Sequence, residues 1–328
     1  RLDIAVSYDV LSASYPVDAA DNDCSASELE EAPCACFGGA ARRATALAGN
    51  RTLRLDGGNY KAGPSLFSPE ASQSLFDATN YSAWTLGPRD VEVGGAVVTN
   101  GGQLAQLVSI DGVTVAVLAL VKSPPLPYQE TLTAAFQELY IHVDDHLGQP
   151  DAVVLMLDGV SDKDIDSLNA ANETDAIERL ARRFPVIDIV IVTRGAFQGT
   201  SRLTNWAHRP VVVVGVDGGP TSISRIRLDT ETAAADVDVV ELGCRVLDHP
   251  RVRSLMDRFK EQVDEELAVS IAGYVDATIN ASTVGNLAAD ALAWKFDVDV
   301  GLVANYSLGR DAVWGPGRVY DTQVIDMM

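Results

Sequence analysis

The chain has 328 residues, 47% of them hydrophobic, so it can bury a substantial core in one large domain or two. Its formal net charge of −21 argues against nucleic-acid binding, which needs clustered Lys and Arg to neutralise phosphates. No stretch reaches the roughly 18 apolar residues of a membrane span. Such acidity favours solubility in a crowded or saline extracellular setting, with a calcium-binding surface as the alternative.

Strands and helices alternate along the first half of the chain. The pattern predicts strands at Leu2 to Val10, Leu53 to Asp56, Trp84 to Asp90 and Ala152 to Leu157, and helices at Gly38 to Ala48, within 68–81 and at Gln129 to Leu147. Asp111-Gly112 predicts a hairpin turn between strands in the region 97–120. The start of the helix at Gly38 suits either anion binding or packing, and packing is the preferred interpretation.

The second half continues with a helix at Glu173 to Phe184 and a strand at Ile187 to Val192. The apolar run Pro210 to Val216 predicts a buried strand, with Ile223 to Leu228 as its antiparallel partner and Val237 to Leu242 as one more strand. A long charged helix then spans 250–270, with one apolar stripe made by Leu255, Phe259, Val263 and Leu267.

Polar residues follow several of these strands directly. Asp56, Gly57, Gly58 and Asn59 end one strand, and the two glycines allow a sharp turn there. Because sites in α/β proteins lie beyond the carboxyl ends of strands, we expect these ends to converge on one edge.

In their order, these segments resemble the amino-terminal domain of the 5′-nucleotidase family, within the calcineurin-like metallophosphoesterases. The family's first motif, Asp-x-His, corresponds here to Asp9-Val10-Leu11, and its Gly-Gly-x-Ala-Arg helix start corresponds to Gly38 to Arg42. Its Asp-x-Gly-Asp motif corresponds to Asp56 to Asn59, and its Gly-Asn-His-Glu motif to Gly87 to Asp90. The family's strand that ends near a His corresponds to Leu157-Asp158-Gly159, and its Gly-His-x-His motif to Arg194-Gly195-Ala196. The resemblance implies a four-layer α/β/β/α sandwich with mixed sheets.

The departures from the family fall on its metal ligands. Leu11 cannot ligate, and Asn59 is neutral where the family's carboxylate bridges two metals. Two-metal catalysis needs ligands around two cations that lie about 3.5–4 Å apart. Arg89 and Arg194 stand at positions where the family has His ligands, and each brings a fixed positive charge in place of a metal ligand. We therefore expect no cofactor, with a divalent metal such as Zn or Mn as the alternative. The remnant of the family site is Asp9, Asp56, Asn59, Arg89, Asp90 and Arg194, with Pro88 and Ala196 also replacing family ligands.

The resemblance also implies a domain organisation. Residues 1–248 would form the metallophosphoesterase-like domain, 249–275 a linker helix, and 276–328 the beginning of a 5′-nucleotidase carboxy-terminal-like domain, truncated or continued beyond Met328. In that last part, Asn305 and Arg310 match the family residues that contact the nucleotide.

The four cysteines are Cys24, Cys34 and Cys36 in one acidic loop, and Cys244 far along the chain. Three thiolates without a nearby His leave a zinc tetrahedron incomplete. We therefore predict one disulfide within the loop, and a second joining Cys244 to the remaining loop cysteine.

Five Asn-x-Ser/Thr sequons indicate the secretory pathway. The chain also starts at Arg1 without a Met, as after removal of a signal peptide. The expected location is secreted or cell-surface. The sequons begin at Asn50, Asn80, Asn172, Asn280 and Asn305.

Three functions compete. The first is an inactive homologue that serves as a structural or interaction glycoprotein, with other extracellular proteins or copies of itself as partners. The second is a metal-dependent 5′-nucleotidase or phosphoesterase with a rearranged site that uses Asp9, Asp56, Asp90 and Asp158. The third is a nucleotide or anion binder that uses Arg89 and Arg194 as fixed charges.

Overall fold

The structure is a computed structural model. It describes residues 1–8, 16–17, 24, 35–49, 51–58, 69–85, 105–121, 150–158, 170–194, 197–216, 219, 221–269, 271–275, 289 and 317–320. The chain divides into two compact units, residues 1–256 and 257–328, and the division falls within helix α7 (Pro250–Val269). No described helix has the length and apolarity to cross a membrane.

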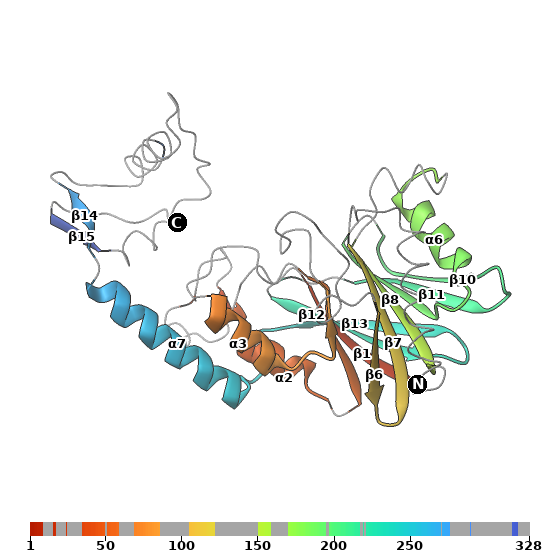
Figure 1. The fold of residues 1–328 in the computed structure, drawn as a ribbon, viewed down its shortest axis with the longest axis horizontal. Helices are drawn as coiled ribbons and strands as arrows, with labels where there is room; N and C mark the ends of the chain where they lie inside the picture. The colour runs from red at the N-terminus through yellow and green to blue at the C-terminus, as the bar shows by residue number, and fades with distance from the viewer. Residues whose placement is uncertain are drawn as a thin grey trace. The chain divides into compact units, whose positions relative to one another are not determined.

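Two mixed sheets form the first unit (Figure 1). In the five-stranded sheet, β1 lies parallel to β4 and antiparallel to β12. The strand order of this first sheet is β13 (Ala234–Glu241), β12 (Ser222–Asp229), β1 (Leu2–Ser7), β4 (Thr52–Asp56) and β5 (Ala83–Trp84).

The six-stranded sheet has a parallel centre and antiparallel edges. β7, β8, β9 and β11 are parallel neighbours, and β6 and β10 pair antiparallel at the two ends. All seven residues of β8 are buried, which explains its continuous apolar sequence. The order of this second sheet is β10 (Thr200–Thr204), β11 (Pro210–Gly215), β9 (Ile189–Arg194), β8 (Ala152–Asp158), β7 (Val113–Val121) and β6 (Ala105–Ile110).

One hydrophobic core lies between the sheets and continues beneath α6 (Glu173–Arg183). Alternate residues of β1 and β4, such as Ile4 and Leu55, join it from the first sheet. Ile177 and Leu180 join it from α6, which contacts β10 and β11. A smaller core on the other side of the first sheet combines Ala5 with Leu47.

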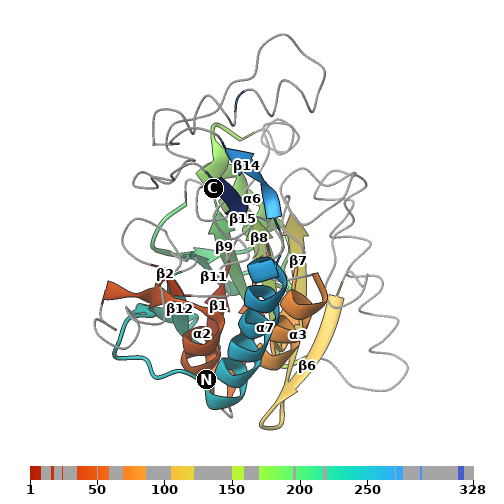
Figure 2. The same cartoon turned by 90° about the vertical axis from the view of Figure 1, so that its left-hand side faces the viewer.

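That smaller core places α2 (Ala40–Leu47) against the outer face of the first sheet (Figure 2). Helix α3 (Pro69–Thr79) lies beside α2. The described elements therefore stack as helix, sheet, sheet and helix, with α2 and α6 on opposite outer faces.

Most predicted elements are confirmed. The hairpin between β6 and β7 turns at Asp111 and Gly112, whose φ angles of 51° and 81° are those of a type I′ turn. Helix α2 begins at Ala40 and not at Gly38, because Gly38 and Gly39 have φ angles of 75° and 86°, which a right-handed helix cannot contain. The helix expected at 129–147 lies outside the described residues.

One expectation for the second half is wrong, and two further findings add to the sequence analysis. β12 does not pair with β11: it joins the other sheet, between β1 and β13. The polar segment Thr200–Thr204 is an edge strand, although its sequence predicts none. On α7 the buried side chains are Val252 and Met256, whereas Leu255 and Phe259 are half-buried, and the side chains of Val263 and Leu267 are not described.

The second unit is described by fewer elements. After the end of α7, β14 (Ile271–Val275) pairs antiparallel with β15 (Gly317–Tyr320). The predicted start of a carboxy-terminal-like domain at 276 stays a prediction.

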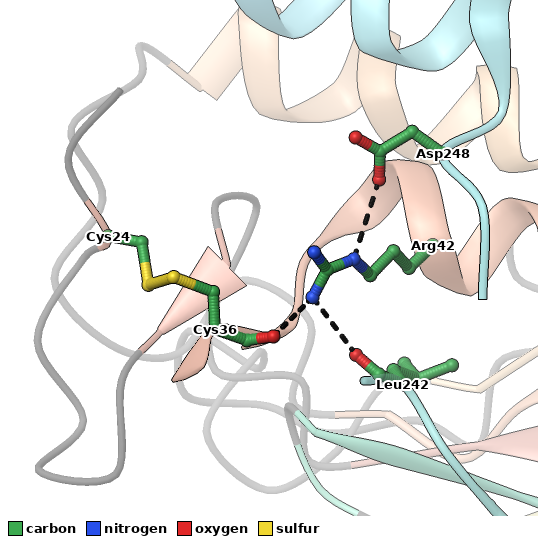
Figure 3. Close-up of a disulfide and its surroundings, with 5 residues drawn as sticks. All are labelled: Cys24, Cys36, Arg42, Leu242 and Asp248. Atoms are coloured by element: carbon green, nitrogen blue, oxygen red, sulfur yellow. Dashed lines mark hydrogen bonds and ion pairs between the residues drawn. A yellow bond between two sulfur atoms is a disulfide. The ribbon is translucent and has the colours of Figure 1, made fainter. Parts of the chain in front are cut away.

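The acidic loop is closed by a disulfide between Cys24 and Cys36 (Figure 3). This confirms the bridge predicted within the loop. Cys244 is also disulfide-bonded, as expected, and its predicted partner among the loop cysteines, Cys34, lies outside the described residues. The loop returns to the fold through a two-residue ladder between β2 (Pro16–Val17) and β3 (Phe37–Gly38).

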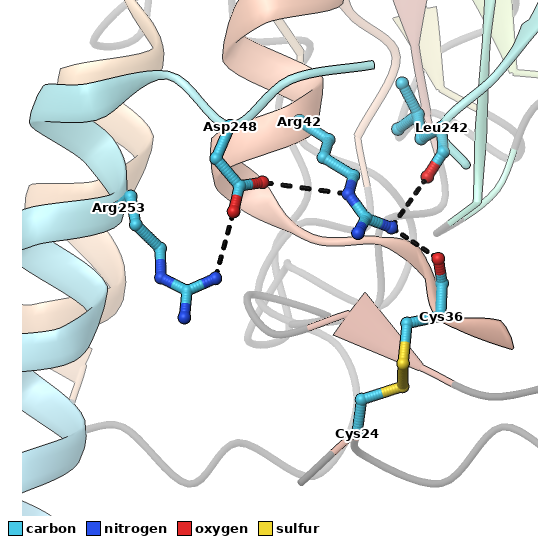
Figure 4. A network of polar contacts seen from close by, with 6 residues as sticks. All are labelled: Cys24, Cys36, Arg42, Leu242, Asp248 and Arg253. Atoms are coloured by element: carbon cyan, nitrogen blue, oxygen red, sulfur yellow. Dashed lines mark hydrogen bonds and ion pairs between the residues drawn. A yellow bond between two sulfur atoms is a disulfide. The ribbon is translucent and has the colours of Figure 1, made fainter. Parts of the chain in front are cut away.

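Arg42, on α2, holds this region together from a buried position (Figures 3 and 4). Its guanidinium donates to the carbonyl oxygens of Cys36 and Leu242, and its Nε lies 3.7 Å from Asp248 Oδ1. Asp248 in turn accepts a hydrogen bond of 2.9 Å from Arg253 of α7. These contacts of Arg42 are compatible with the preferred interpretation of the Gly38 helix start, packing, which stays a prediction.

Burial lowers the pKa of the Arg42 guanidinium below its ordinary value, while Asp248 acts in the opposite direction. An arginine nevertheless stays protonated in a protein, so the buried group is a cation with its charge offset by Asp248. Removing the guanidinium would leave the carbonyl oxygens of Cys36 and Leu242 without this hydrogen-bond donor, and the Asp248 carboxylate without this positive charge.

Replacing Arg42 with Met should lower the free energy of unfolding by about 3 kcal/mol, because breaking a buried pair leaves its partner uncompensated. Urea denaturation with the disulfides intact measures this. Arg51→Met is the matched control: Arg51 also pairs with an aspartate, Asp111, but its side chain is 78% exposed, so its loss should cost less than about 1 kcal/mol. Equal effects of the two substitutions would contradict a central role for Arg42.

Candidate functional site

The carboxyl ends of strands from both sheets meet at one place, as the sequence predicts. Gly57 follows β4, and a Cβ atom added there would lie 2.7 Å from Thr193 Cγ2 and 2.8 Å from Tyr8 Cβ. Thr193 belongs to β9 of the second sheet, and Tyr8 follows β1 of the first. Only a glycine allows the two sheet ends to approach so closely.

Asp56, the last residue of β4, is fully buried at this junction. Its Oδ2 accepts a hydrogen bond of 2.7 Å from Ser7 Oγ, and its Oδ1 accepts one of 3.0 Å from the Gly58 backbone N–H. The second bond spans two residues and shapes the turn that follows the strand. Both carboxylate oxygens are thus engaged in holding the strand end.

Tyr81 adds a second hydroxyl to this cluster. Its Oη lies 2.8 Å from Ser7 Oγ, so a chain of polar groups runs from Tyr81 through Ser7 to Asp56. The Phe76 ring of α3 packs against Tyr81 at 4.8 Å and edge-on against Trp84 at 5.4 Å between ring centroids. This aromatic contact fixes the segment that carries Tyr81 beside the end of β4.

A second carboxylate, Asp158, ends β8 and is 2% exposed. It stands opposite Arg194 in the ladder between β8 and β9, after a local shift of register. Thr193 donates a hydrogen bond of 3.5 Å to the carbonyl oxygen of Leu157, which ties the two strand ends together. The structure thus brings Asp56, Asp158 and the backbone of Arg194 to the same region.

The other predicted site residues lie outside the described part of the chain. These are Asp9, Asn59, Arg89, Asp90, Asn305 and Arg310, and the side chain of Arg194 is also not described. Among the described residues, no three His, Cys, Asp or Glu side chains cluster closely enough to hold a metal ion. An ion pair between Arg89 or Arg194 and either Asp9 or Asp56 therefore stays a prediction.

Two of the five sequons can be placed. Asn80 is exposed just after α3, with a φ angle of 59°. Asn172 is exposed at the start of α6, where its Oδ1 accepts a hydrogen bond of 2.9 Å from the Asp175 backbone N–H. Both side chains can therefore project into solvent.

Ser7, Tyr8, Tyr81 and Thr193 are the site residues that sequence reasoning missed. Ser7 is opposite Asp56 in the parallel ladder of β1 and β4. The only sequence signal is a polar residue that ends the apolar alternation of β1, and its importance depends on the register between strands.

Solved structures with a similar fold include two proteins named as nucleotidases and one named as a thiohydrolase. The 5′-nucleotidase precursor of Thermus thermophilus is 16% identical, with a TM-score of 0.58 over 100% of this chain and 73% of that one. The NAD nucleotidase of Haemophilus influenzae is 13% identical, with a TM-score of 0.56 over 100% and 74% of the two chains. A sulfate thiohydrolase of Thermus thermophilus, solved with glycerol, is 11% identical, with a TM-score of 0.53 over 90% and 68%.

These similarities confirm the predicted fold class, an α/β metallophosphoesterase-like sandwich. Identities this low establish a shared fold and not a shared activity. No protein-family model matches the sequence, and no curated protein matches it either.

The polar chain at the site yields a stability prediction. Ser7→Ala should lower the free energy of unfolding by about 1–3 kcal/mol, because it removes a donor from a fully buried carboxylate. Ser109→Ala, at an exposed position on the edge strand β6, should change it by less than about 0.5 kcal/mol. Urea denaturation of the two variants side by side measures the difference, and an equal response would mean that Ser7 does not support Asp56.

Proposed function

We propose that this chain is a catalytically inactive homologue of the 5′-nucleotidases and works as a secreted or cell-surface interaction glycoprotein. The observation that carries the proposal is the setting of Asp56. This carboxylate lies where the fold predicts the metal site, yet it is fully buried and both its oxygens accept hydrogen bonds from within the chain. It acts as a structural group at the strand end.

The residues at the remaining positions do not fit a two-metal centre. Such a centre is built from carboxylate, imidazole and similar donors. Leu11, Pro88 and Ala196 offer no side-chain donor atom, and Arg89 and Arg194 are cations that would repel a dication. The donor set supports loss of the metals and, with them, of hydroxide formation at the site.

Without metals, the negative charge of the carboxylates at the strand ends would have to be offset by a cationic side chain of the same chain. A buried carboxylate without compensation costs several kcal/mol. The backbone of Arg194 stands opposite Asp158 on the neighbouring strand, which makes Arg194 a candidate for this role. We therefore retain the expectation that Arg89 or Arg194 pairs with Asp9 or Asp56, and we add Asp158 as a further acceptor.

The purified chain should hydrolyse neither AMP nor a generic phosphodiester above background, with or without added Zn²⁺ or Mn²⁺. Losing hydroxide generation and charge stabilisation removes orders of magnitude in rate. Phosphate release and the metal content of the protein are the measurements. Metal-dependent turnover that Asp9→Ala abolishes would refute the proposal and favour a phosphoesterase with a rearranged site.

A secretory location is supported by two features of the described residues. The Cys24–Cys36 disulfide suits an oxidising compartment. The sequon residues Asn80 and Asn172 are exposed at the ends of helices, where a glycan meets no packed neighbour. A glycan joined to Nδ2 of Asn172 would leave its Oδ1 free to cap α6.

Protein expressed in eukaryotic secretory cells should carry N-glycans at Asn80 and Asn172, shown by peptide mass spectrometry before and after glycosidase treatment. Thr174→Ala should abolish the glycan at Asn172 without loss of the helix cap. Asn172→Gln should abolish both and cost about 1 kcal/mol more in stability. Protein without glycans and with four free thiols would place the chain in another compartment. A glycan at Asn305 would exclude nucleotide binding through the family's pocket.

A further inference from the structure

An exposed tryptophan and three arginines form a patch at the end of the second sheet. We define the cationic patch as Arg182 and Arg183 at the end of α6 together with Trp206, His208 and Arg209 in the turn between β10 and β11. Trp206 is 69% exposed, and the Arg183 guanidinium lies 6.0 Å from its ring centroid. Trp and Arg are the residues most enriched where partners contribute binding energy.

The turn that carries Trp206 is held in a fixed shape by buried hydrogen bonds. Asn205 is 3% exposed, and its Oδ1 accepts hydrogen bonds of 3.0 Å and 2.9 Å from the backbone N–H groups of Ala207 and Arg209. Its Nδ2 donates to the carbonyl oxygen of Pro185 at 3.1 Å. The backbone N–H of Trp206 donates to the carbonyl oxygen of Arg182 at 3.0 Å. The patch is therefore pre-organised, which lowers the entropy lost on binding.

The patch keeps an excess of positive charge. Arg182 lies 3.7 Å from Glu178, and Arg209 lies 3.0 Å from Asp188. Arg183 is in no ion pair among the described residues, and its contact is the Trp206 ring. Such a surface in a chain with a net charge of −21 selects an acidic ligand locally.

The chain itself contains a segment with the matching chemistry. Residues 18–31, around the bridged Cys24, hold six acidic residues and neither Lys nor Arg: Asp18, Asp21, Asp23, Glu28, Glu30 and Glu31. Leu29 stands between two of these glutamates, as an apolar side chain suited to contact with an exposed Trp ring.

The described anchors of this acidic loop lie far from the cationic patch of their own chain. Its ends are held beside α2, through the Cys24–Cys36 bridge and the bond from Arg42 to Cys36. The eleven residues between Cys24 and Cys36, which include Glu28, Glu30 and Glu31, must return to their start, so their backbone extends at most about 20 Å from the bridge. Because α2 and α6 lie on opposite outer faces of two stacked sheets, they are separated by about 30 Å.

We infer that the cationic patch of one copy binds the acidic loop of a second copy. The two surfaces differ, so the contact is head-to-tail and each bound copy still offers a free patch or loop, which leads to chains or closed rings. The inference goes beyond the proposed interaction role, and it does not depend on the absence of catalysis.

The mass of the assembly at different protein concentrations tests this contact. In about 0.15 M salt, where the Debye length of about 8 Å screens the repulsion between distant charges, the weight-average mass should rise beyond twice the chain mass of 34.9 kDa. In about 1 M salt it should return toward the monomer value, because the contact itself is electrostatic. Sedimentation or light scattering gives the mass.

Variants of the two surfaces distinguish this contact from a symmetric one. Arg183→Glu and Trp206→Ala should each weaken association about tenfold or more, which is 1.4 kcal/mol. A loop variant with Glu28→Lys, Glu30→Lys and Glu31→Lys should be monomeric as well. A mixture of Trp206→Ala with the loop variant should form pairs and nothing larger, since only the intact loop of the first and the intact patch of the second can meet. Arg251→Glu, an exposed charge reversal at the start of α7, is the matched control and should assemble like the unmodified chain.

Unchanged circular dichroism and thermal midpoint would show that each variant is folded. An unmodified chain that stays monomeric at every concentration would overturn the inference, and so would assembly that the patch variants leave unchanged. Failure of the mixture to pair would also overturn it. If the unmodified chain and all variants are monomeric, and only the patch variants lose retention on a heparin column, the inference is overturned and the patch binds a sulfated polysaccharide instead.

Discussion

The buried guanidinium of Arg42 is the interaction on which the organisation of the first unit depends. A cation taken out of water must find compensation nearby, and Arg42 finds it in the carbonyls of Cys36 and Leu242 and in the carboxylate of Asp248. These partners come from the base of the disulfide loop, from the end of β13 and from the segment before α7. One charge thereby fixes where three distant segments meet α2.

The strand ends obey a different constraint, which is steric. Gly57 lets the ends of the two sheets touch, and the polar groups trapped there must satisfy one another. Asp56 does so through Ser7 and Gly58, and Tyr81 extends the same chain of hydroxyl groups. A carboxylate at this position is therefore useful to the fold even without a metal.

Charge is distributed unevenly over the two outer faces of the sandwich. The acidic loop is attached beside α2, and the patch around Trp206 lies where α6 meets the β10–β11 turn. Neither feature belongs to the strand ends where related folds would place chemistry. Loops and turns on a rigid scaffold are the parts that change most easily, so contacts with partners can arise there without a change at the strand ends.

The sequence by itself determined most of the strands and helices, the hairpin at Asp111-Gly112 and the disulfide within the loop, because local patterns of apolar residues, glycines and cysteines predict each of them. The fold class came from the order of motifs that resembles a known family. The sequence also singled out Asp56 at the end of a strand, and the role of Asp56 in a functional site stays a prediction. Only the tertiary structure decided that β12 belongs to the first sheet, that Thr200–Thr204 is a strand, and that Ser7, Tyr81 and Thr193 surround Asp56. The pattern of apolar residues in the sequence predicts which faces of a strand are buried, but it does not predict which strand lies beside it. Register, sheet membership and contacts between sheets join residues far apart in the chain, so no local pattern encodes them.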